Sequence, residues 1–236
     1  MKIELLYGEV ANFYGDPQNA VYLSQCDPDC EIINTRLDSV PYFAAERPDI
    51  ILIGSMSEAM QRLAIKSLMP YKERIIELID DGVVFLATGN AYEIFTEKIE
   101  YVTEKITVDG LGLFPLTVKT DLFARYNGMV IGEADGMTLT GFRSQFSFVY
   151  GDNSDFAFIK VERGVGINKQ SKLEGVRRKN FIGTHLIGPI LPLNPEFCEY
   201  VLRLAGSNAT AAHKEAAMAA YDRRVAEFRD PKVKFD

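Results

Sequence analysis

Two segments of the chain contain residues whose types and spacing could support catalysis or ligand binding. Gly82–Phe95 (GVVFLATGNAYEIF) runs from an apolar stretch into a turn of small residues and then into a helical pattern. Such a turn presents one side chain at the edge of a sheet, beside a helix N-terminus that stabilises negative charge. Gly183–Pro195 (GTHLIGPILPLNP) leads from a β-like run into a Gly- and Pro-rich loop, where Asn194 suits the N-cap of a helix. Taken alone, the first segment is more simply explained as a tight turn that requires glycine.

A polar loop, Asn12–Asn19, directly follows the first predicted strand. Open α/β sheets bind ligands beyond the carboxyl ends of their strands. We therefore expect Asn12 and Asp16 to lie at a ligand site.

The cysteines and histidines do not predict a metal site. Cys26 and Cys30 are four residues apart, but His185 and His213 are both distant from them in sequence. A closed zinc site needs four ligands, usually in two close pairs. We expect a loop at the cysteines and a solvent-exposed His213.

The elements that must position these residues alternate between strands and helices in the first half of the chain. This alternation predicts crossover units and a mostly parallel sheet. The expected strands are Ile3–Tyr7, Glu31–Thr35, Ile50–Ile53 and Val83–Ala87, and the expected helices are Ala20–Gln25, Ser57–Leu68 and Tyr71–Asp80, with Gly82 as the stop of the last one.

The second half is richer in short β-like stretches and ends in helices. The stretches are Leu116–Lys119, Met129–Glu133, Met137–Phe142, Ala157–Val161 and Asn180–Gly183, and the helices are Pro195–Leu204 and Ala209–Phe228. We expect one α/β domain over 1–206 and, over 207–236, a terminal helix that packs on the domain or extends from it. The apolar face of this helix, formed by Met218, Tyr221, Val225 and Phe228, is expected to pack on the protein itself, with docking of a partner as the alternative.

Composition restricts the class of protein. The 236 residues are 47% hydrophobic and 25% charged, which is typical of a globular domain. A formal net charge of −7 disfavours nucleic acid as a partner. Three cysteines indicate a reducing compartment, and no run reaches the ~18 apolar residues of a membrane span. Glu4 and Glu9 interrupt the apolar N-terminus, unlike a secretory signal. We expect a soluble cytoplasmic protein without membrane insertion.

Six segments, in this order along the chain, together resemble a known family. They are LYGEVANFYGDPQN, PDIILIGSMSEAMQ, GLGLFPLTVKT, RYNGMVIGEADG, GVRRKNFIGTHLIGPILPLNP and AAHKEAA. The chain resembles the CobB/CobQ-like branch of the triad glutamine amidotransferases, and within it the GatD-type glutaminase subunits of lipid II isoglutaminyl synthases. The resemblance implies a three-layer α/β sandwich with a central, mostly parallel sheet, of the class I glutamine amidotransferase (flavodoxin-like) type, and no cofactor.

The family hydrolyses glutamine with a cysteine nucleophile, a histidine base and a supporting carboxylate, and it passes the ammonia to a synthetase. The family elbow reads roughly Cys-Gly-Gly-Tyr-Gln, and Tyr92 and Glu93 match its last two positions. The nucleophile therefore corresponds to Gly89 and the base to Ile187, while Asp16 matches the supporting acid. The resemblance implies that both reacting groups are missing.

Other family positions yield ligand-binding candidates. His185 falls two places before the base position, and strand alternation would put both on one face, about 6.6 Å apart. Arg125 matches a functional family arginine. The candidates for ligand binding are Asn12, Asp16, Asn90, Arg125 and His185.

The sequence therefore favours a non-catalytic binding or regulatory subunit. The resemblance implies a partner, either a Mur-ligase-like ATP-dependent synthetase or a second copy of the chain, and a small amide or amino-acid ligand. The alternative is an enzyme. It would be an active glutaminase that supplies ammonia for cell-wall or corrinoid amidation, or a repurposed hydrolase that uses His185 and Asp16.

Overall fold

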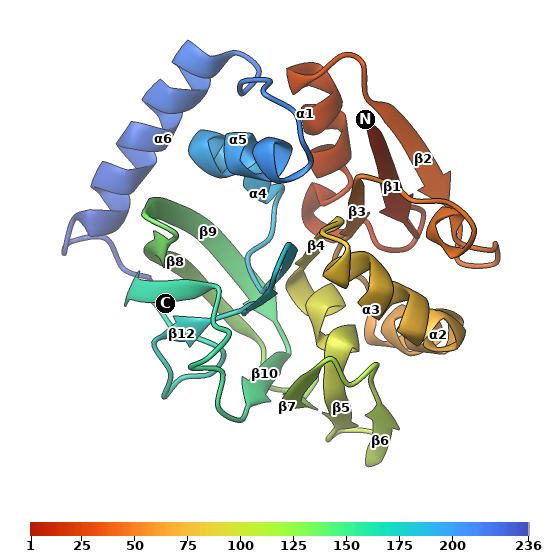
Figure 1. Ribbon diagram of the computed structural model, residues 1–236. Helices are drawn as coiled ribbons and strands as arrows, with labels where there is room; N and C mark the ends of the chain where they lie inside the picture. The colour runs from red at the N-terminus through yellow and green to blue at the C-terminus, as the bar shows by residue number, and fades with distance from the viewer. Residues whose placement is uncertain (236) are drawn as a thin grey trace.

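A six-stranded sheet forms the centre of the computed structural model, which describes residues 1–235 (Figure 1). All neighbouring strands are parallel except the β13–β14 pair at one edge. In sheet order the strands are β13 (Val176–Arg178), β14 (Phe181–Thr184), β4 (Val84–Thr88), β3 (Ile50–Ile53), β1 (Lys2–Leu6) and β2 (Glu31–Thr35).

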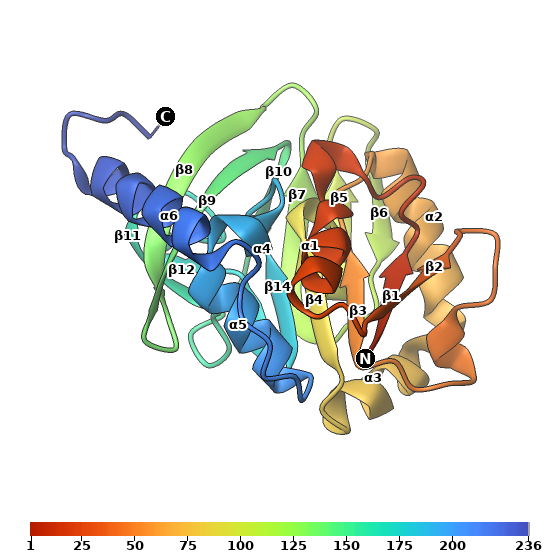
Figure 2. The ribbon, with the colours of Figure 1, turned by 90° about the horizontal axis from the view of Figure 1, so that it is seen from above.

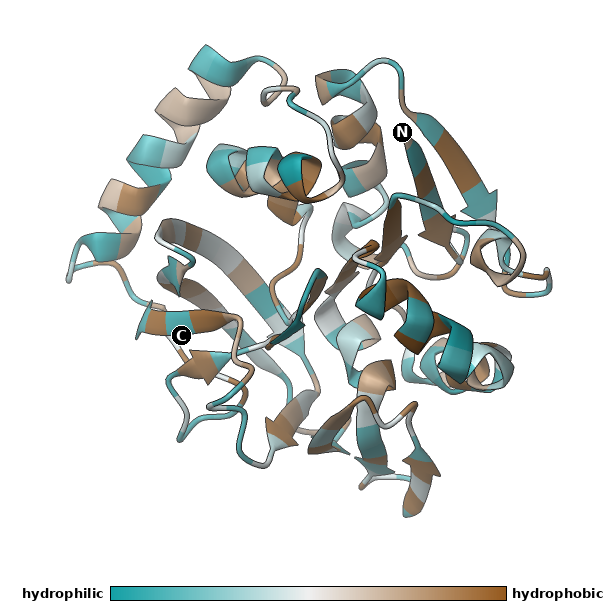
Figure 3. Cartoon of the chain, in the orientation of Figure 1, coloured by the Kyte–Doolittle hydropathy of each residue, from teal (hydrophilic) through white to brown (hydrophobic). Residues whose placement is uncertain are grey.

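Helices cover both faces of this sheet and produce three layers (Figures 1 and 2). Alternate residues of β3 belong to two separate cores: Ile51 and Ile53 to one, and Ile50 and Leu52 to the other. A strand that is buried on both faces needs a continuous apolar run, which explains why β3 is uniformly brown in Figure 3. The helices of the first core are α2 (Glu58–Leu68) and α3 (Lys72–Asp80), and those of the second are α1 (Gln18–Cys26), α4 (Ile190–Leu193) and α5 (Pro195–Leu204).

The remaining strands form two further four-stranded sheets, which the sequence analysis did not anticipate. The sequence pattern located four of these eight strands but not their partners, because pairing depends on contacts distant in sequence. One sheet has the order β10 (Ser147–Tyr150), β7 (Phe114–Thr120), β5 (Thr96–Tyr101) and β6 (Ile106–Asp109), and the other β12 (Leu173–Glu174), β11 (Ile159–Arg163), β8 (Tyr126–Ala134) and β9 (Met137–Gln145). Short 3-10 helices span Phe13–Gly15, Tyr42–Ala44, Met69–Tyr71 and Gly89–Phe95.

Several predicted helix boundaries are confirmed. Ser57 caps α2 and accepts a hydrogen bond from Met60 N at 3.3 Å, and Gly82 follows α3 with a φ of +82°. Asn194 is the N-cap residue of α5, as predicted, but its side chain does not bond to that helix. Its Oδ1 instead accepts from Thr140 N at 2.9 Å, which ties α5 to β9.

The last helix, α6 (Lys214–Arg229), starts later than the predicted Ala209–Phe228, so the prediction was wrong for its first turn. Other elements hold that part of the backbone. Ala212 N donates to Cys26 Sγ at 3.2 Å, and Ala212 O accepts from Tyr22 Oη at 3.0 Å. These contacts take the place of helical hydrogen bonds and override the helix propensity of the alanines.

The apolar face of α6 packs on the protein itself. Tyr221 is buried and donates from its hydroxyl to Thr138 O of β9 at 2.8 Å, and Met218, Val225 and Phe228 are partly buried. Figure 1 shows α6 lying along α5 and the β8–β9 pair. The expected self-packing is therefore observed, while the boundary at residue 206 stays a prediction.

We predict that Tyr221→Ala lowers the free energy of unfolding by about 2 kcal/mol, because it removes a buried ring and a hydrogen bond. Urea titration with circular dichroism measures this value. Ala219→Ser, at an exposed position of the same helix, serves as the control and should change stability by less than about 0.5 kcal/mol. An unchanged midpoint for Tyr221→Ala would contradict the packing described here.

Candidate functional site

The central parallel strands β1, β3, β4 and β14 end at one edge of the sheet. The loops that follow them carry Asp16, Ser55, Gly89 and Ile187, respectively. The carboxyl edge of an open α/β sheet is where such folds bind ligands. The topology thus brings Asp16, Gly89 and Ile187 together, as the sequence predicted.

The turn after β4 leaves no room for a side chain. Gly89 has a φ of +58°, a left-handed conformation that favours glycine. A Cβ placed on Gly89 would lie 1.9 Å from Ser55 Oγ and 3.0 Å from Ile187 Cγ2. The helix expected after the turn is a short 3-10 helix, Gly89–Phe95, so the turn has no extended helix N-terminus. Ser55 and Ile187 thus fill the space that a nucleophile would use.

Asp16 links three of these loops. Its carboxylate is 3% exposed and accepts from Ser55 N at 2.7 Å, Ser55 Oγ at 2.8 Å and Gly188 N at 3.3 Å. Burial raises the pKa of Asp16, and the hydrogen bonds from Ser55 oppose that rise. Within residues 1–235, these bonds hold the loops, and no imidazole contacts the carboxylate.

Backbone donors near the turn are already occupied. Met56 N donates to Asn90 Oδ1 at 3.0 Å, and Asn90 Nδ2 donates back to Met56 O at 2.8 Å. Ser55 N donates to Asp16. Stabilising an oxyanion requires N–H groups that are free to point at the reacting oxygen. Neither N–H of the Ser55–Met56 loop meets that requirement.

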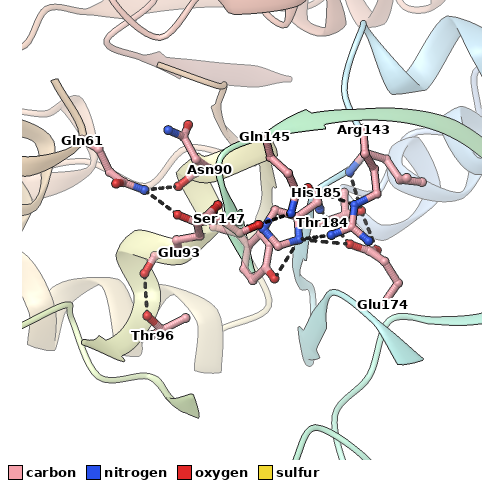
Figure 4. Close-up of polar contacts among 12 residues, drawn as sticks. Gln61, Asn90, Glu93, Thr96, Arg143, Gln145, Ser147, Glu174, Thr184 and His185 are labelled. Carbon is pink, nitrogen blue, oxygen red and sulfur yellow. Dashed lines mark hydrogen bonds and ion pairs between the residues drawn. The ribbon is translucent and has the colours of Figure 1, made fainter. Parts of the chain in front are cut away.

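His185 lies in a buried polar cluster (Figure 4). Its Nδ1 lies 3.0 Å from Arg143 Nη2, and its Nε2 lies 2.9 Å from Glu93 Oε1. A guanidinium can only donate, so Nδ1 accepts and Nε2–H donates to Glu93. Burial, and then the charge of Arg143, lower the pKa of His185 well below its usual value. The imidazole is therefore neutral and positioned by its partners.

The alternation used to place His185 next to Ile187 does not extend that far. Strand β14 ends at Thr184, and Ile187 instead pairs with β9, where its N–H donates to Phe142 O at 3.0 Å. The chain changes direction between these positions. Consequently Ile187 contacts Gly89 whereas His185 contacts Glu93.

Glu93 connects this cluster to a pocket. It is 1% exposed and accepts from the Ser147 hydroxyl, from His185 and from Gln61 Nε2 at 2.9 Å. Burial raises the pKa of Glu93 to about 7, against the effect of its donors and of Arg143. The space in and above the pocket, part of it open to solvent, is about 480 Å³. Its lining comprises Phe13, Tyr14, Ser55, Met56, Glu58, Gln61, Asn90, Glu93, Thr120, Ser144, Gln145, Phe146 and Ser147.

The structure separates the five predicted ligand-binding residues. Asn90 lines the pocket, and Asp16 lies directly behind Ser55. Arg125 donates to Ser144 Oγ at 2.7 Å and so reaches the pocket wall through that serine. Asn12 is exposed, donates to Glu9 O at 3.1 Å and is not among the lining residues, although its neighbour Phe13 is. His185 reaches the pocket through Glu93 and through Arg143, which donates to the lining residue Gln145.

Arg143 and Gln145 belong to the same cluster but were not among the residues predicted from the sequence. Arg143 is fully buried and donates to Gln145 Oε1 at 2.9 Å and to Val165 O at 2.9 Å. Both residues occupy the inward-facing positions of β9, in phase with Met137 and Leu139. A charged residue at the buried phase of an alternating strand was the available signal.

Among the described residues, the three cysteines do not form a second candidate site. Cys26 Sγ lies 3.8 Å from Cys198 Sγ, on α5, and Cys30 is not part of this contact. Among residues 1–235, no group of three or more His, Cys, Asp or Glu side chains is arranged to hold a metal ion. In that part of the chain, none of the helices has the length and apolarity that crossing a membrane requires.

We predict that Glu93→Gln removes one component of the pH dependence of the free energy of unfolding. The pKa of Glu93 rises from 4.5 to about 7 on folding, so the folded protein holds this proton more tightly. Its contribution is fully present below pH 4.5 and is lost as pH rises to about 7, about 3 kcal/mol in total. His185 has the opposite effect on stability, because its pKa is lowered on folding and its contribution is lost as pH falls.

Urea unfolding of both proteins at pH 5, 6, 7 and 8 measures this effect. The stability of Glu93→Gln relative to the wild type should rise by about 3 kcal/mol between pH 5 and pH 8. Glu97→Gln makes the same charge change at an exposed position of β5. Its free energy of unfolding should change with pH in the same way as that of the wild type. A constant difference between Glu93→Gln and the wild type would contradict the prediction.

The parallel sheet, the turn after β4 and the acidic group beside it define an α/β fold of the class I glutamine amidotransferase type. A sequence profile of the CobB/CobQ-like glutamine amidotransferase domain matches residues 2–194, and the chain belongs to this family. The resemblance found in the sequence is thereby confirmed at the level of the family.

Curated relatives and solved structures agree with this assignment. The chain is 32% identical over 200 residues to the lipid II isoglutaminyl synthase (glutamine-hydrolyzing) subunit GatD of Staphylococcus aureus (strain N315), covering 82% of this chain and 79% of that protein. It is 25% identical over 202 residues to subunit GatD of Streptococcus pneumoniae (strain ATCC BAA-255 / R6), covering 82% and 76%.

Two solved structures confirm the fold. A crystal structure of a glutamine amidotransferase matches with a TM-score of 0.57 at 14% identity, covering 86% of this chain and 98% of that one. PurLQS from Thermotoga maritima matches with a TM-score of 0.53 at 11% identity, covering 95% and 98%.

Proposed function

We propose that this chain is a GatD-like subunit that does not hydrolyse glutamine and that binds a small ligand and a partner protein. The observation that carries the proposal is the turn at Gly89. Nucleophilic catalysis needs an attacking atom next to a base. Gly89 supplies no such atom, and Ser55 and Ile187 occupy the space beside it.

The surroundings of the turn support the same conclusion. Asp16 is engaged with Ser55 and Gly188, and His185, whose pKa is lowered by burial and then by Arg143, is neutral and contacts Glu93. A repurposed hydrolase based on His185 and Asp16 would need these two groups to share one reacting centre. Their hydrogen bonds lead to different residues, which disfavours that alternative.

The likeness to GatD supports a role in lipid II amidation, in the cytoplasm and together with a Mur-ligase-like ATP-dependent synthetase. A subunit that keeps the framework of its family without the reacting groups retains a surface for docking and a pocket for a ligand. We propose a complex with such a synthetase, or a homodimer, as the working form. Light scattering and co-purification with a Mur-ligase-like protein from the native host test this assembly. Light scattering that shows a strict monomer, together with co-purification that recovers no such protein, would refute the proposed assembly.

We predict no glutamine hydrolysis above the buffer background. The assay measures glutamate release by the purified protein, alone and with its Mur-ligase-like partner. In addition, 6-diazo-5-oxo-norleucine, which traps catalytic thiols, should leave no adduct near residue 89 in a mass spectrum. A catalytically active GatD run in parallel is the positive control. Glutamate release that disappears in Asp16→Asn would overturn the proposal and favour an active glutaminase.

A further inference from the structure

The buried cluster around Glu93 contains more negative than positive charge (Figure 4). The carboxylates of Glu93 and Glu174 and the guanidinium of Arg143 are each at most 1% exposed. His185 adds no charge, because its lowered pKa keeps it neutral. When Glu93 is ionised, the cluster therefore has one uncompensated negative charge, an arrangement that is strongly unfavourable in a protein interior.

The uncompensated carboxylate is the one that lines the pocket. Glu93 belongs to the pocket lining, whereas Glu174 is tied to the β14 end by bonds from Thr184 Oγ1 and His185 N, each at 2.8 Å. Glu93 Oε1 already accepts from Ser147 and His185, whereas among residues 1–235 Oε2 accepts only from Gln61. Each carboxylate oxygen can accept two hydrogen bonds, so Oε2 can still accept one more.

The other lining residues also favour a positively charged ligand. Glu58 is the second carboxylate of the pocket, and within the described chain no Lys, Arg or His is among the lining residues. Phe13 and Tyr14 supply aromatic rings, whose faces attract cations, while the Arg125 guanidinium already lies 5.7 Å from the ring centre of Phe146. A ligand that enters the pocket thus meets negative charge and aromatic rings.

An independent observation indicates that the pocket receives a polar group. Thr120 lines the pocket, and its hydroxyl is buried without a hydrogen-bond partner among the described residues. Buried hydroxyls in folded proteins nearly always have a partner. A bound ligand with hydrogen-bonding groups would provide one.

We propose that this pocket binds a small molecule through a protonated primary amine, with Glu93 as its counter-ion and Thr120 as a second polar contact. The ammonium supplies the positive charge that the buried cluster lacks and an N–H donor for Glu93 Oε2. The proposal rests on the proposed function, since the same pocket would otherwise receive glutamine for hydrolysis. It narrows the ligand to one that presents an ammonium group rather than only a neutral amide.

Binding of methylammonium chloride tests the proposal, with potassium chloride and acetamide as matched probes. Potassium has the charge without N–H donors, and acetamide has N–H donors without the charge. Titration by calorimetry at pH 8 and constant ionic strength should show saturable binding of methylammonium alone. Equal responses to methylammonium and potassium, or binding of acetamide without methylammonium, would overturn the proposal.

Three variants test whether methylammonium binds in the pocket. Glu93→Gln should weaken methylammonium binding about tenfold or more, because it removes a charged hydrogen bond. Thr120→Val keeps the shape of the side chain and should weaken binding several-fold without loss of stability. Glu97→Gln, the same charge change on the surface, should bind like the wild type. Unchanged affinity in both pocket variants would overturn the proposal.

The outcome is separable from that of the proposed function. The amine titration contains no glutamine and measures no turnover, so absent methylammonium binding overturns only this inference. Glutamate release in the separate assay would overturn the proposed function, whether or not the amine binds.

Discussion

Gly89→Cys combined with Ile187→His should yield no glutaminase activity, although it introduces a thiol and an imidazole at the positions that the family resemblance assigns to nucleophile and base. The new Cβ would meet Ser55 Oγ at 1.9 Å, so the Ser55 loop or the turn must move. Overpacking and a side chain at a φ of +58° should together lower the free energy of unfolding by about 3 kcal/mol. Glutamate release and urea unfolding measure the two effects.

A double-mutant cycle separates the steric clash from backbone strain. Gly89→Ala should cost about 3 kcal/mol in the wild type and about 1 kcal/mol in a Ser55→Gly background, because only the strain and the contact with Ile187 remain there. Equal costs in both backgrounds would show that Ser55 does not fill the site. Robust turnover by the Gly89→Cys, Ile187→His variant would show that the catalytic pocket had survived.

The central sheet was predictable from local sequence, whereas the arrangement of the second half was not. The predicted limits of β2, Glu31–Thr35, and β3, Ile50–Ile53, match the structure, since runs bounded by turn residues define buried strands. In the two further sheets, β7, β8, β9 and β11 were located but β5, β6, β10 and β12 were missed, and the division into two sheets depends on pairings such as β5 with β7. Such pairings leave no local signal in one sequence.

The candidate site was likewise predictable only in part from the sequence. The family elbow pattern placed Gly89 correctly at the turn after β4, and the polar loop after β1 placed Asp16 beside it. The alternation argument failed for His185, because the strand ends one residue earlier. That the partners of His185 are Glu93 and Arg143 follows from three segments meeting in space, which spacing alone cannot predict.

The polar cluster also joins several elements of the fold around the candidate site. The hydrogen bonds of His185, Glu93 and Glu174 join the 3-10 helix, β9 and β14 independently of any chemistry at Gly89. Buried polar networks of this kind contribute to stability only while every member is satisfied. Their integrity is therefore a structural requirement in its own right.

Arg143→Met should be strongly destabilising, by about 4 kcal/mol at pH 8. The substitution leaves Gln145 Oε1, Val165 O and Gly166 O without their donor. It also leaves the buried carboxylates with no counter-charge, and loss of one partner from a buried ionic group is typically this unfavourable. Urea unfolding monitored by fluorescence or circular dichroism measures the change.

The pH dependence and a second substitution identify the cause. Arg143 lowers the pKa of Glu93, so without Arg143 the carboxyl takes up a proton more readily, and the destabilisation should be smaller at pH 6 than at pH 8. For the same reason, Glu93→Gln should partly rescue Arg143→Met at pH 8. Arg125→Met, which removes an exposed arginine bonded to Ser144, should change stability by less than about 0.5 kcal/mol. A loss that is equal at both pH values and not rescued by Glu93→Gln would mean that packing, not charge, makes Arg143 indispensable.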